Sequence, residues 1–229
     1  MSIAREAWVL FTLAGGGAVL AYAICGFACA APLIAVAVLI PYLFRDPERR
    51  VPPAPLGVVS PVDGRAVVSG EVDDPFLGRK SIKITISMSL LGPFVMRSPI
   101  EGRVMQQWYL PEGLDPNLLG NMDAASLARE PDARQGRYAM WVQTDEQDDV
   151  VIALRGALIS QRLRCGVQMG ERIGQGQRCG LIQLAASADV YLPANSRIEV
   201  VQGDALHAGS DIIATLVHKE SPVAATVSG

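Results

Sequence analysis

Residues Ser81–Met88 read Ser-Ile-Lys-Ile-Thr-Ile-Ser-Met and carry the clearest structural pattern of the chain. Apolar side chains alternate with polar ones, which is the period of a half-buried β-strand. Short apolar runs of the same kind, separated by glycine and proline, are found at Tyr138–Val142, Val150–Leu154, Leu181–Leu184 and Ile212–Leu216. The pattern predicts a mainly antiparallel β domain.

Two pairs of similar turns predict an internal repeat in this domain. Ser60–Arg65 reads Ser-Pro-Val-Asp-Gly-Arg, and Ser98–Arg103 reads Ser-Pro-Ile-Glu-Gly-Arg. Gly170–Gly176 and Gly203–Gly209 form the second pair, each opening on Gly-Glu or Gly-Asp and closing on Gly. Repeated turns followed by strands favour a barrel-sandwich-like fold with internal pseudo-repeats, as in lipoyl- or biotin-carrier domains. A carrier needs an exposed lysine in a hairpin turn, and the few lysines of this chain do not favour that role.

The N-terminal part of the chain differs sharply from the rest. Ala7–Phe44 contains no Asp, Glu, Lys, Arg or His. A membrane-spanning helix needs about 20 apolar residues, so the run suffices for two short spans, with Gly26 and Pro32 bracketing the turn. A signal peptide has a shorter apolar core, and a buried soluble hairpin would show a polar face. We therefore expect residues 1–46 to form a transmembrane helical hairpin and residues 47–229 to form the β domain.

The charges that flank the apolar run predict its orientation. Arg5 precedes the run, and Arg45, Arg49 and Arg50 follow it. Positively charged flanks favour the cytoplasmic side of a membrane. We therefore expect an inner-membrane protein whose soluble domain faces the cytoplasm. The prolines of the segment Pro47–Pro53 predict an extended linker between the anchor and the domain.

Composition excludes two other classes of function. The net charge of −3 argues against a nucleic-acid-binding protein, which would usually be basic. The four cysteines and two histidines have no metal-site spacing, so we expect no metal. Free cysteines fit a reducing compartment.

Four segments, taken in order, resemble the short, membrane-anchored phosphatidylserine decarboxylases of bacteria and archaea: Phe44–Arg49, Val58–Gly64, Ile86–Pro99 and Gly180–Pro193. The resemblance implies phospholipid metabolism, with phosphatidylserine converted to phosphatidylethanolamine. It also implies a self-made cofactor, because in this family a serine hydroxyl attacks the preceding carbonyl and elimination then leaves a pyruvoyl group on the new N-terminus. That ketone is the electron sink for decarboxylation.

The resemblance also locates the residues for this chemistry, and two of them are replaced. The family's serine falls at Ala186, which has no oxygen to attack a carbonyl, and its histidine falls at Phe94, which transfers no proton. Its aspartate matches Asp63, an orienting or charge-stabilising carboxylate, although Asp-Gly is also a common turn pair. Ser187 could replace the lost serine. However, neighbouring side chains of a strand point to opposite faces, so this would require a one-residue bulge.

These replacements predict a non-catalytic family member that forms no pyruvoyl cofactor. Its expected partners are the phospholipid membrane, phosphatidylserine included, and a second copy or an active relative in a dimer. Arg49, Arg50 and Arg97 are the candidate lipid head-group residues. Two alternatives remain open: an active decarboxylase that uses Ser187 or an unrecognised nucleophile, and a membrane-tethered binding module that binds no phospholipid.

Overall fold

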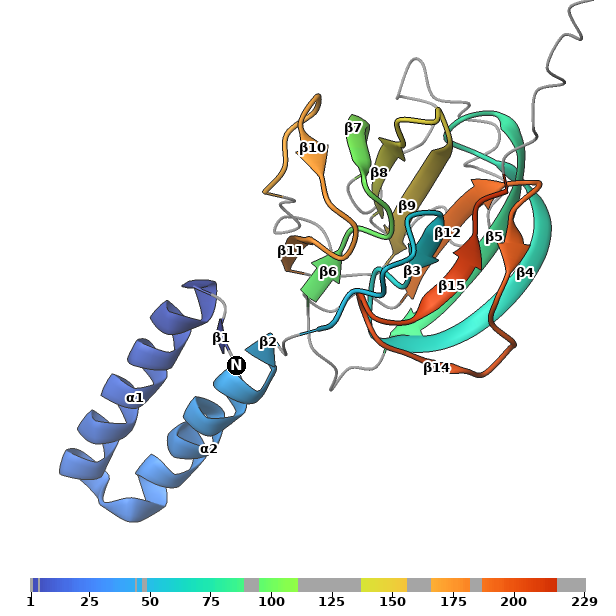
Figure 1. Cartoon of the computed structure of the whole chain (residues 1–229). Coiled ribbons are helices and arrows are strands. Elements are labelled where there is room, and N and C mark those ends of the chain that lie inside the picture. The colour runs from blue at the N-terminus through green and yellow to red at the C-terminus, as the bar shows by residue number, and fades with distance from the viewer. Residues whose placement is uncertain are drawn as a thin grey trace, which may run out of the picture.

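The computed structural model describes residues 2–3, 5–43, 45–46, 49–88, 95–110, 137–155, 166–181 and 187–217. Two helices lie at the N-terminal end, and strands dominate the described chain after them (Figure 1). The prediction of a mainly β protein preceded by a helical hairpin is therefore confirmed at this level. The predicted boundary after residue 46 stays a prediction.

The two helices, α1 (Arg5–Cys25) and α2 (Phe27–Leu43), run side by side in opposite directions (Figure 1). Gly26 separates them with a φ of 77°, a left-handed conformation that glycine reaches without steric cost. The expectation that Pro32 borders the turn is wrong, because Pro32 lies inside α2. Inside a helix proline removes one backbone hydrogen bond, but its fixed φ is close to the helical value, whereas the turn needs a positive φ.

The open end of the hairpin is closed by a short ladder. β1 (Ser2–Ile3) pairs antiparallel with β2 (Arg45–Asp46), so both ends of the hairpin lie together. Within the part of the chain that the structure describes, neither helix combines the length and the hydropathy needed to cross a membrane. Many outward side chains of the helices are apolar, and exposed fractions of 63–72% are found for Leu13, Val19, Leu20, Ile24, Phe27 and Val38.

Eight strands form one antiparallel sheet in the order β10-β7-β8-β9-β12-β5-β4-β14. Their bounds are β4 Gly64–Asp74, β5 Arg79–Met88, β7 Gly102–Leu110, β8 Arg137–Gln143, β9 Asp149–Arg155, β10 Arg172–Ile173, β12 Ser187–Pro193 and β14 Ala205–Leu206. Two smaller sheets combine β3 Gly57–Val59, β13 Arg197–Ile198 and β15 Ile212–Thr215, and β6 Val95–Arg97 and β11 Arg178–Leu181. In Figure 1 the long strands curl, and β3 and β15 lie in front of them.

The predicted strands appear close to where the alternation places them. β5 contains Ser81–Met88, β8 contains the predicted run Tyr138–Val142, and β9 contains the predicted run Val150–Leu154. β15 covers all but the last residue of the predicted strand Ile212–Leu216. The predicted strand Leu181–Leu184 overlaps β11 at Leu181, and the rest of it lies outside the described residues.

Both faces of the large sheet carry packed side chains. The main core lies between this sheet and the smaller ones, and it includes the fully buried Ile84 and Ile86 of β5. A second cluster on the opposite face includes Trp108 and Tyr191. The tip of the β4–β5 hairpin covers it, because the ring of Phe76 lies 5.2 Å from Trp108 and 5.8 Å from Tyr191, measured between centroids. The polar face of β5 is therefore partly covered as well.

The predicted repeat is present in the hydrogen bonds of the turns. The hydroxyls of Ser60 and Ser98 each donate to the carbonyl oxygen two residues later, both at 2.7 Å. The backbone carbonyls of these serines accept turn-glycine amides at 2.8 Å, from Gly209 and Gly176 respectively. Two segments far apart in sequence thus build the same local structure, which places the turns 174–177 and 207–211 in equivalent positions.

Candidate functional site

Three of the predicted site residues come together where the two equivalent turns meet. We call this region the turn corner and define it by Arg49, Asp63, Arg97, Gly176 and Gly209. A Cβ on Gly209 would lie 2.7 Å from Cδ of Arg97 and 3.4 Å from Cα of Gly176. Glycine at position 209 therefore allows the two turns to approach the Arg97 side chain closely.

Both carboxylate oxygens of Asp63 are engaged in the turn corner. Oδ1 accepts the backbone N–H of Ala208 at 2.6 Å. Oδ2 accepts a hydrogen bond from Nη2 of Arg49 at 2.7 Å, and this ion pair is largely enclosed, with side-chain exposures of 16% and 18%. A charge-assisted pair of this kind is stronger than a neutral hydrogen bond. Asp63 therefore connects the segment after the hairpin to the turn 207–211.

Comparison with the repeated turn separates this role from turn formation. Glu101 is the counterpart of Asp63, and its side chain is 67% exposed and pairs with Arg172 at 3.5 Å. Both turns form, yet the acidic side chains have different surroundings. The interpretation of Asp63 as a turn residue alone is therefore incomplete.

The predicted head-group arginines differ in exposure. Arg50 is exposed, whereas Arg49 is mostly enclosed by its pairing with Asp63. Arg97 is half-buried; its Nη1 donates to the carbonyl of Gly176 at 3.0 Å, and its backbone stands opposite Arg178 in the β6–β11 ladder. The structure thus assembles Arg49 and Arg97 in the turn corner, and Arg50 follows Arg49 at its surface.

The two replaced family positions, Phe94 and Ala186, lie outside the described residues. The described strands end close to them in sequence. β6 begins at Val95 and β11 ends at Leu181, and these two residues are paired in the ladder. The ladder that carries Arg97 therefore begins one residue after Phe94 and ends five residues before Ala186 in the sequence.

Ser187 opens β12 on the large sheet, and β5 separates it from β4, the strand that begins directly after Asp63. Ser187 stands opposite Ser87 of β5 and Arg155 of β9. Its neighbour Ala188 is buried in the main core. By strand alternation Ser187 therefore lies on the opposite face, together with Asp189.

A buried charged cluster on that second face was not predicted from the sequence. Asp189 is 1% exposed, and its Oδ1 accepts hydrogen bonds from Oγ1 of Thr85 at 2.6 Å and from Nη2 of Arg155 at 3.0 Å. Its Oδ2 lies 2.9 Å from Nε of Arg155 and 3.6 Å from Nζ of Lys83. Lys83 also lies over the ring of Tyr191, 5.6 Å from its centroid. The sequence feature that could have predicted this cluster is the acidic residue Asp189 within the apolar run of β12.

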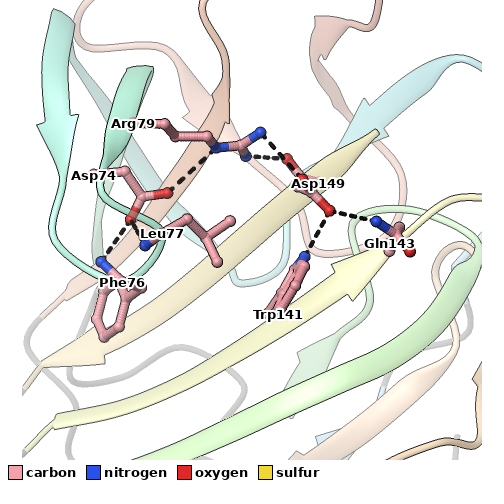
Figure 2. A network of polar contacts seen from close by, with 7 residues as sticks. All are labelled: Asp74, Phe76, Leu77, Arg79, Trp141, Gln143 and Asp149. Carbon is pink, nitrogen blue, oxygen red and sulfur yellow. Dashed lines mark hydrogen bonds and ion pairs between the residues drawn. The ribbon is translucent and has the colours of Figure 1, made fainter. Parts of the chain in front are cut away.

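A second polar network, also absent from the sequence predictions, joins two hairpins (Figure 2). Arg79 lies between the carboxylates of Asp74 and Asp149, at 3.7 and 3.5 Å. Asp149 also accepts hydrogen bonds from Nε1 of Trp141 at 2.8 Å and from Nε2 of Gln143 at 2.9 Å. Because these residues come from the β4–β5 and β8–β9 hairpins, the network fixes the hairpin tip over the second cluster. We assign it a structural role.

This network predicts a pH dependence of stability. Burial raises the pKa of Asp74 above its ordinary value of 3.8, despite the amides of Phe76 and Leu77 and the Arg79 guanidinium, which act to lower it. Folding then makes this carboxyl hold its proton more tightly, so its contribution to stability falls as pH rises from about 4 through the raised folded pKa. Asp74→Asn removes the titration and keeps an oxygen acceptor.

We therefore expect the stability of the Asp74→Asn variant, relative to the parent chain, to rise between about pH 4 and about pH 7. Urea unfolding midpoints at both pH values measure this difference. Asp73→Asn is the matched control, because the Asp73 side chain is 75% exposed. A difference between parent and Asp74→Asn that does not change with pH would contradict the expectation.

The described residues contain no group of three or more His, Cys, Asp or Glu side chains that could hold a metal ion. They do contain an antiparallel β domain that follows a helical hairpin. Arg49, in the segment after the hairpin, forms a hydrogen bond with Asp63, the residue that matches the family's aspartate. Fold and site together thus describe a β domain whose candidate functional residues lie beside the segment that follows a helical hairpin.

The family model for phosphatidylserine decarboxylase matches residues 37–214. A phosphatidylserine decarboxylase proenzyme of Nitrosomonas eutropha is 36% identical over 212 residues, covering 93% of this chain and 94% of the relative. Proenzymes of Aromatoleum aromaticum and Burkholderia ambifaria are 36% and 35% identical, each covering 93% of this chain and 95% and 96% of the relative. No solved structure matches the chain. The chain belongs to the phosphatidylserine decarboxylase family.

Proposed function

We propose that this chain is a non-catalytic, membrane-associated member of the phosphatidylserine decarboxylase family that binds a phospholipid head group or an active relative. The observation that carries the proposal is the methyl side chain at Ala186, the position that matches the family's self-cleaving serine. Phe94, at the position of the family's histidine, supports it. The losses fall on residues that perform chemistry, whereas the strands and turns of the fold are present.

The residues of this chain do not fit the family's pyruvoyl group. That group forms from a serine, whose oxygen attacks the preceding carbonyl and then leaves from the β-carbon. Ala186 has neither the oxygen nor a β-leaving group, so no step of the family's reaction is assigned to this chain. A site of this composition can bind a ligand, but it does not supply the electron sink that decarboxylation requires.

Membrane association is the second part of the proposal. The exposed apolar side chains of α1 and α2 would lose their contact with water in a bilayer, which stabilises insertion. Arg5, Arg45 and Arg50 flank the hairpin and favour its ends on the cytoplasmic side of the inner membrane. The exposed Arg50 would then lie close to the negatively charged head groups of phosphatidylserine, with Arg97 behind it in the turn corner.

Intact mass spectrometry of the purified full chain tests the catalytic part of this proposal. We expect a single species at 24.4 kDa, the mass of the whole chain. We also expect no release of carbon dioxide from labelled phosphatidylserine. The Nitrosomonas eutropha relative, purified in the same way, serves as the positive control for both measurements. Two fragments, one of them with a keto-acyl N-terminus, would overturn the proposal.

An active decarboxylase is the second candidate, and the names of the relatives favour it. In this case Ser187 would supply the nucleophile. Ser187→Ala would then abolish both cleavage and decarboxylation. Ser87→Ala is the matched control, because Ser87 stands opposite Ser187 in the β5–β12 ladder and the resemblance places no catalytic residue at position 87. Under our proposal both variants and the parent chain remain intact and inactive.

A further inference from the structure

The segment between the hairpin and the β domain is not a free linker. We call residues 49–57 the strap. Val51 packs so closely on Gly176 that a Cβ at that glycine would overlap its methyl group. Nε2 of Gln175 donates to the carbonyl oxygens of Ala54 and Gly57, the first at 3.2 Å. The sequence predicted an extended linker from Pro47 to Pro53, and the structure adds that the strap lies along the turn 174–177.

One charged contact fastens the hairpin end of the strap. Arg49 is the first described residue after strand β2, and it pairs with Asp63. The same carboxylate accepts the amide of Ala208, so one side chain holds the strap and the turn 207–211 at once. Loss of either partner would leave a mostly enclosed charge without its nearest counter-charge, which is costly.

Chain length makes this contact decisive for the position of the hairpin. The β1–β2 ladder ends at Asp46, so only Pro47 and Glu48 separate it from Arg49. A hairpin whose end is fastened within three residues of a docked arginine has few orientations relative to the β domain.

The repeat within the domain supports a specific role rather than a by-product of folding. Asp63 and Glu101 occupy equivalent turns, but Glu101 is exposed and pairs with a different arginine. The turn architecture alone therefore does not require the contact between Asp63 and the strap. The contact forms at the turn that contains Asp63, against the strap residue Arg49.

We propose that Asp63 and Arg49 form a latch that docks the strap on the turn corner and fixes the orientation of the β domain relative to the hairpin. At the position where the family resemblance placed a functional carboxylate, this chain uses the carboxylate to position a membrane-proximal segment. The consequence for lipid binding, that the latch holds Arg50 and the turn corner at the bilayer surface, rests on the membrane association proposed above.

Hydrogen exchange of the full chain in detergent micelles, read by mass spectrometry, tests the latch. We expect Arg49→Ala and Asp63→Asn to raise the exchange rate of the strap amides, Ala54 and Gly57, by about tenfold or more. Arg50→Ala and Glu101→Gln are the matched controls. Arg50 is the sequence neighbour of Arg49, Glu101 is the counterpart of Asp63 in the repeated turn, and neither belongs to the latch. We expect the strap amides of both variants to exchange at the parental rate. The amide of Ile152, in the core strand β9, monitors global folding and should keep its protection in all four variants.

Two results would overturn the latch: equal strap exchange in Arg49→Ala and Arg50→Ala, or equal strap exchange in Asp63→Asn and Glu101→Gln. If Arg49→Ala also exposes Ile152, the comparison rests on Asp63→Asn, which retains an oxygen acceptor for Ala208. Flotation of the parent chain with phosphatidylserine vesicles reports separately on membrane association. A chain that fails to float but shows latch-dependent exchange refutes the membrane proposal alone, and the reverse pattern refutes the latch alone.

Discussion

Replacing Asp189 by asparagine is expected to lower the free energy of unfolding by about 3–5 kcal/mol. Asn keeps an oxygen for the Thr85 hydroxyl but removes the charge that faces Lys83 and Arg155. Both cationic side chains are only 12% exposed, so neither reaches water easily when its nearest carboxylate is lost. Because small domains are stable by only about 5–15 kcal/mol, this single change should abolish a large part of the stability.

Chemical denaturation of the full chain, followed by tryptophan fluorescence, measures the effect. Asp73→Asn is the control, because the Asp73–Lys80 ion pair is exposed and such pairs add little to stability. A triple change of Lys83 and Arg155 to Met and of Asp189 to Leu should recover much of the loss, since apolar residues of similar size often replace a buried ion cluster without cost. If Asp189→Asn unfolds at the same denaturant concentration as Asp73→Asn, the cluster has no such role.

Gly64→Ala and Gly102→Ala are each expected to lower the free energy of unfolding by about 3 kcal/mol, the upper end for overpacking. A Cβ on Gly64 would overlap the backbone carbonyl oxygen of Ser87, and a Cβ on Gly102 would overlap that of Gln143. These oxygens belong to the neighbouring strands β5 and β8. A backbone carbonyl within a ladder does not rotate away as a side chain can, so the strands themselves would have to separate.

Gly166→Ala provides the control for the glycine variants. The nearest atom to its added Cβ is the carbonyl oxygen of Cys179, at 4.0 Å, so the extra methyl group has room. Thermal unfolding midpoints of the three variants compare the sites directly. Equal thermal unfolding midpoints for Gly64→Ala and Gly166→Ala would show that the close approach of residue 64 to β5 does not require glycine at that position.

Local patterns predicted the strands and the repeat because each depends on near neighbours in sequence. Alternation in Ser81–Met88 predicted β5, and its isoleucines enter the core. The matching Ser-Pro-x-acid-Gly-Arg segments predicted equivalent turns, which the serine hydrogen bonds confirm. Pro32 misled the prediction of the hairpin turn, because proline is compatible with both a turn and a helix.

The candidate site was only partly predictable. The family resemblance selected Asp63, yet its partners Arg49 and Ala208 could not be read from the sequence, because 14 and 145 residues separate them from it. The Asp189 cluster shows the same limit, since Thr85 and Asp189 are 104 residues apart. Contacts of this length depend on how the strands are ordered in the sheet, and alternation within one strand carries no information about its neighbours.

The amino-acid sequence alone established that position 186 carries no side-chain oxygen, because alanine has none in any fold. It also determined the β character of the domain, since the alternation of side chains is a local property. The groups around Asp63 became visible only in the tertiary structure, because folding brings them to its carboxylate from distant parts of the chain. In this chain those groups are the guanidinium of Arg49 and the amide of Ala208.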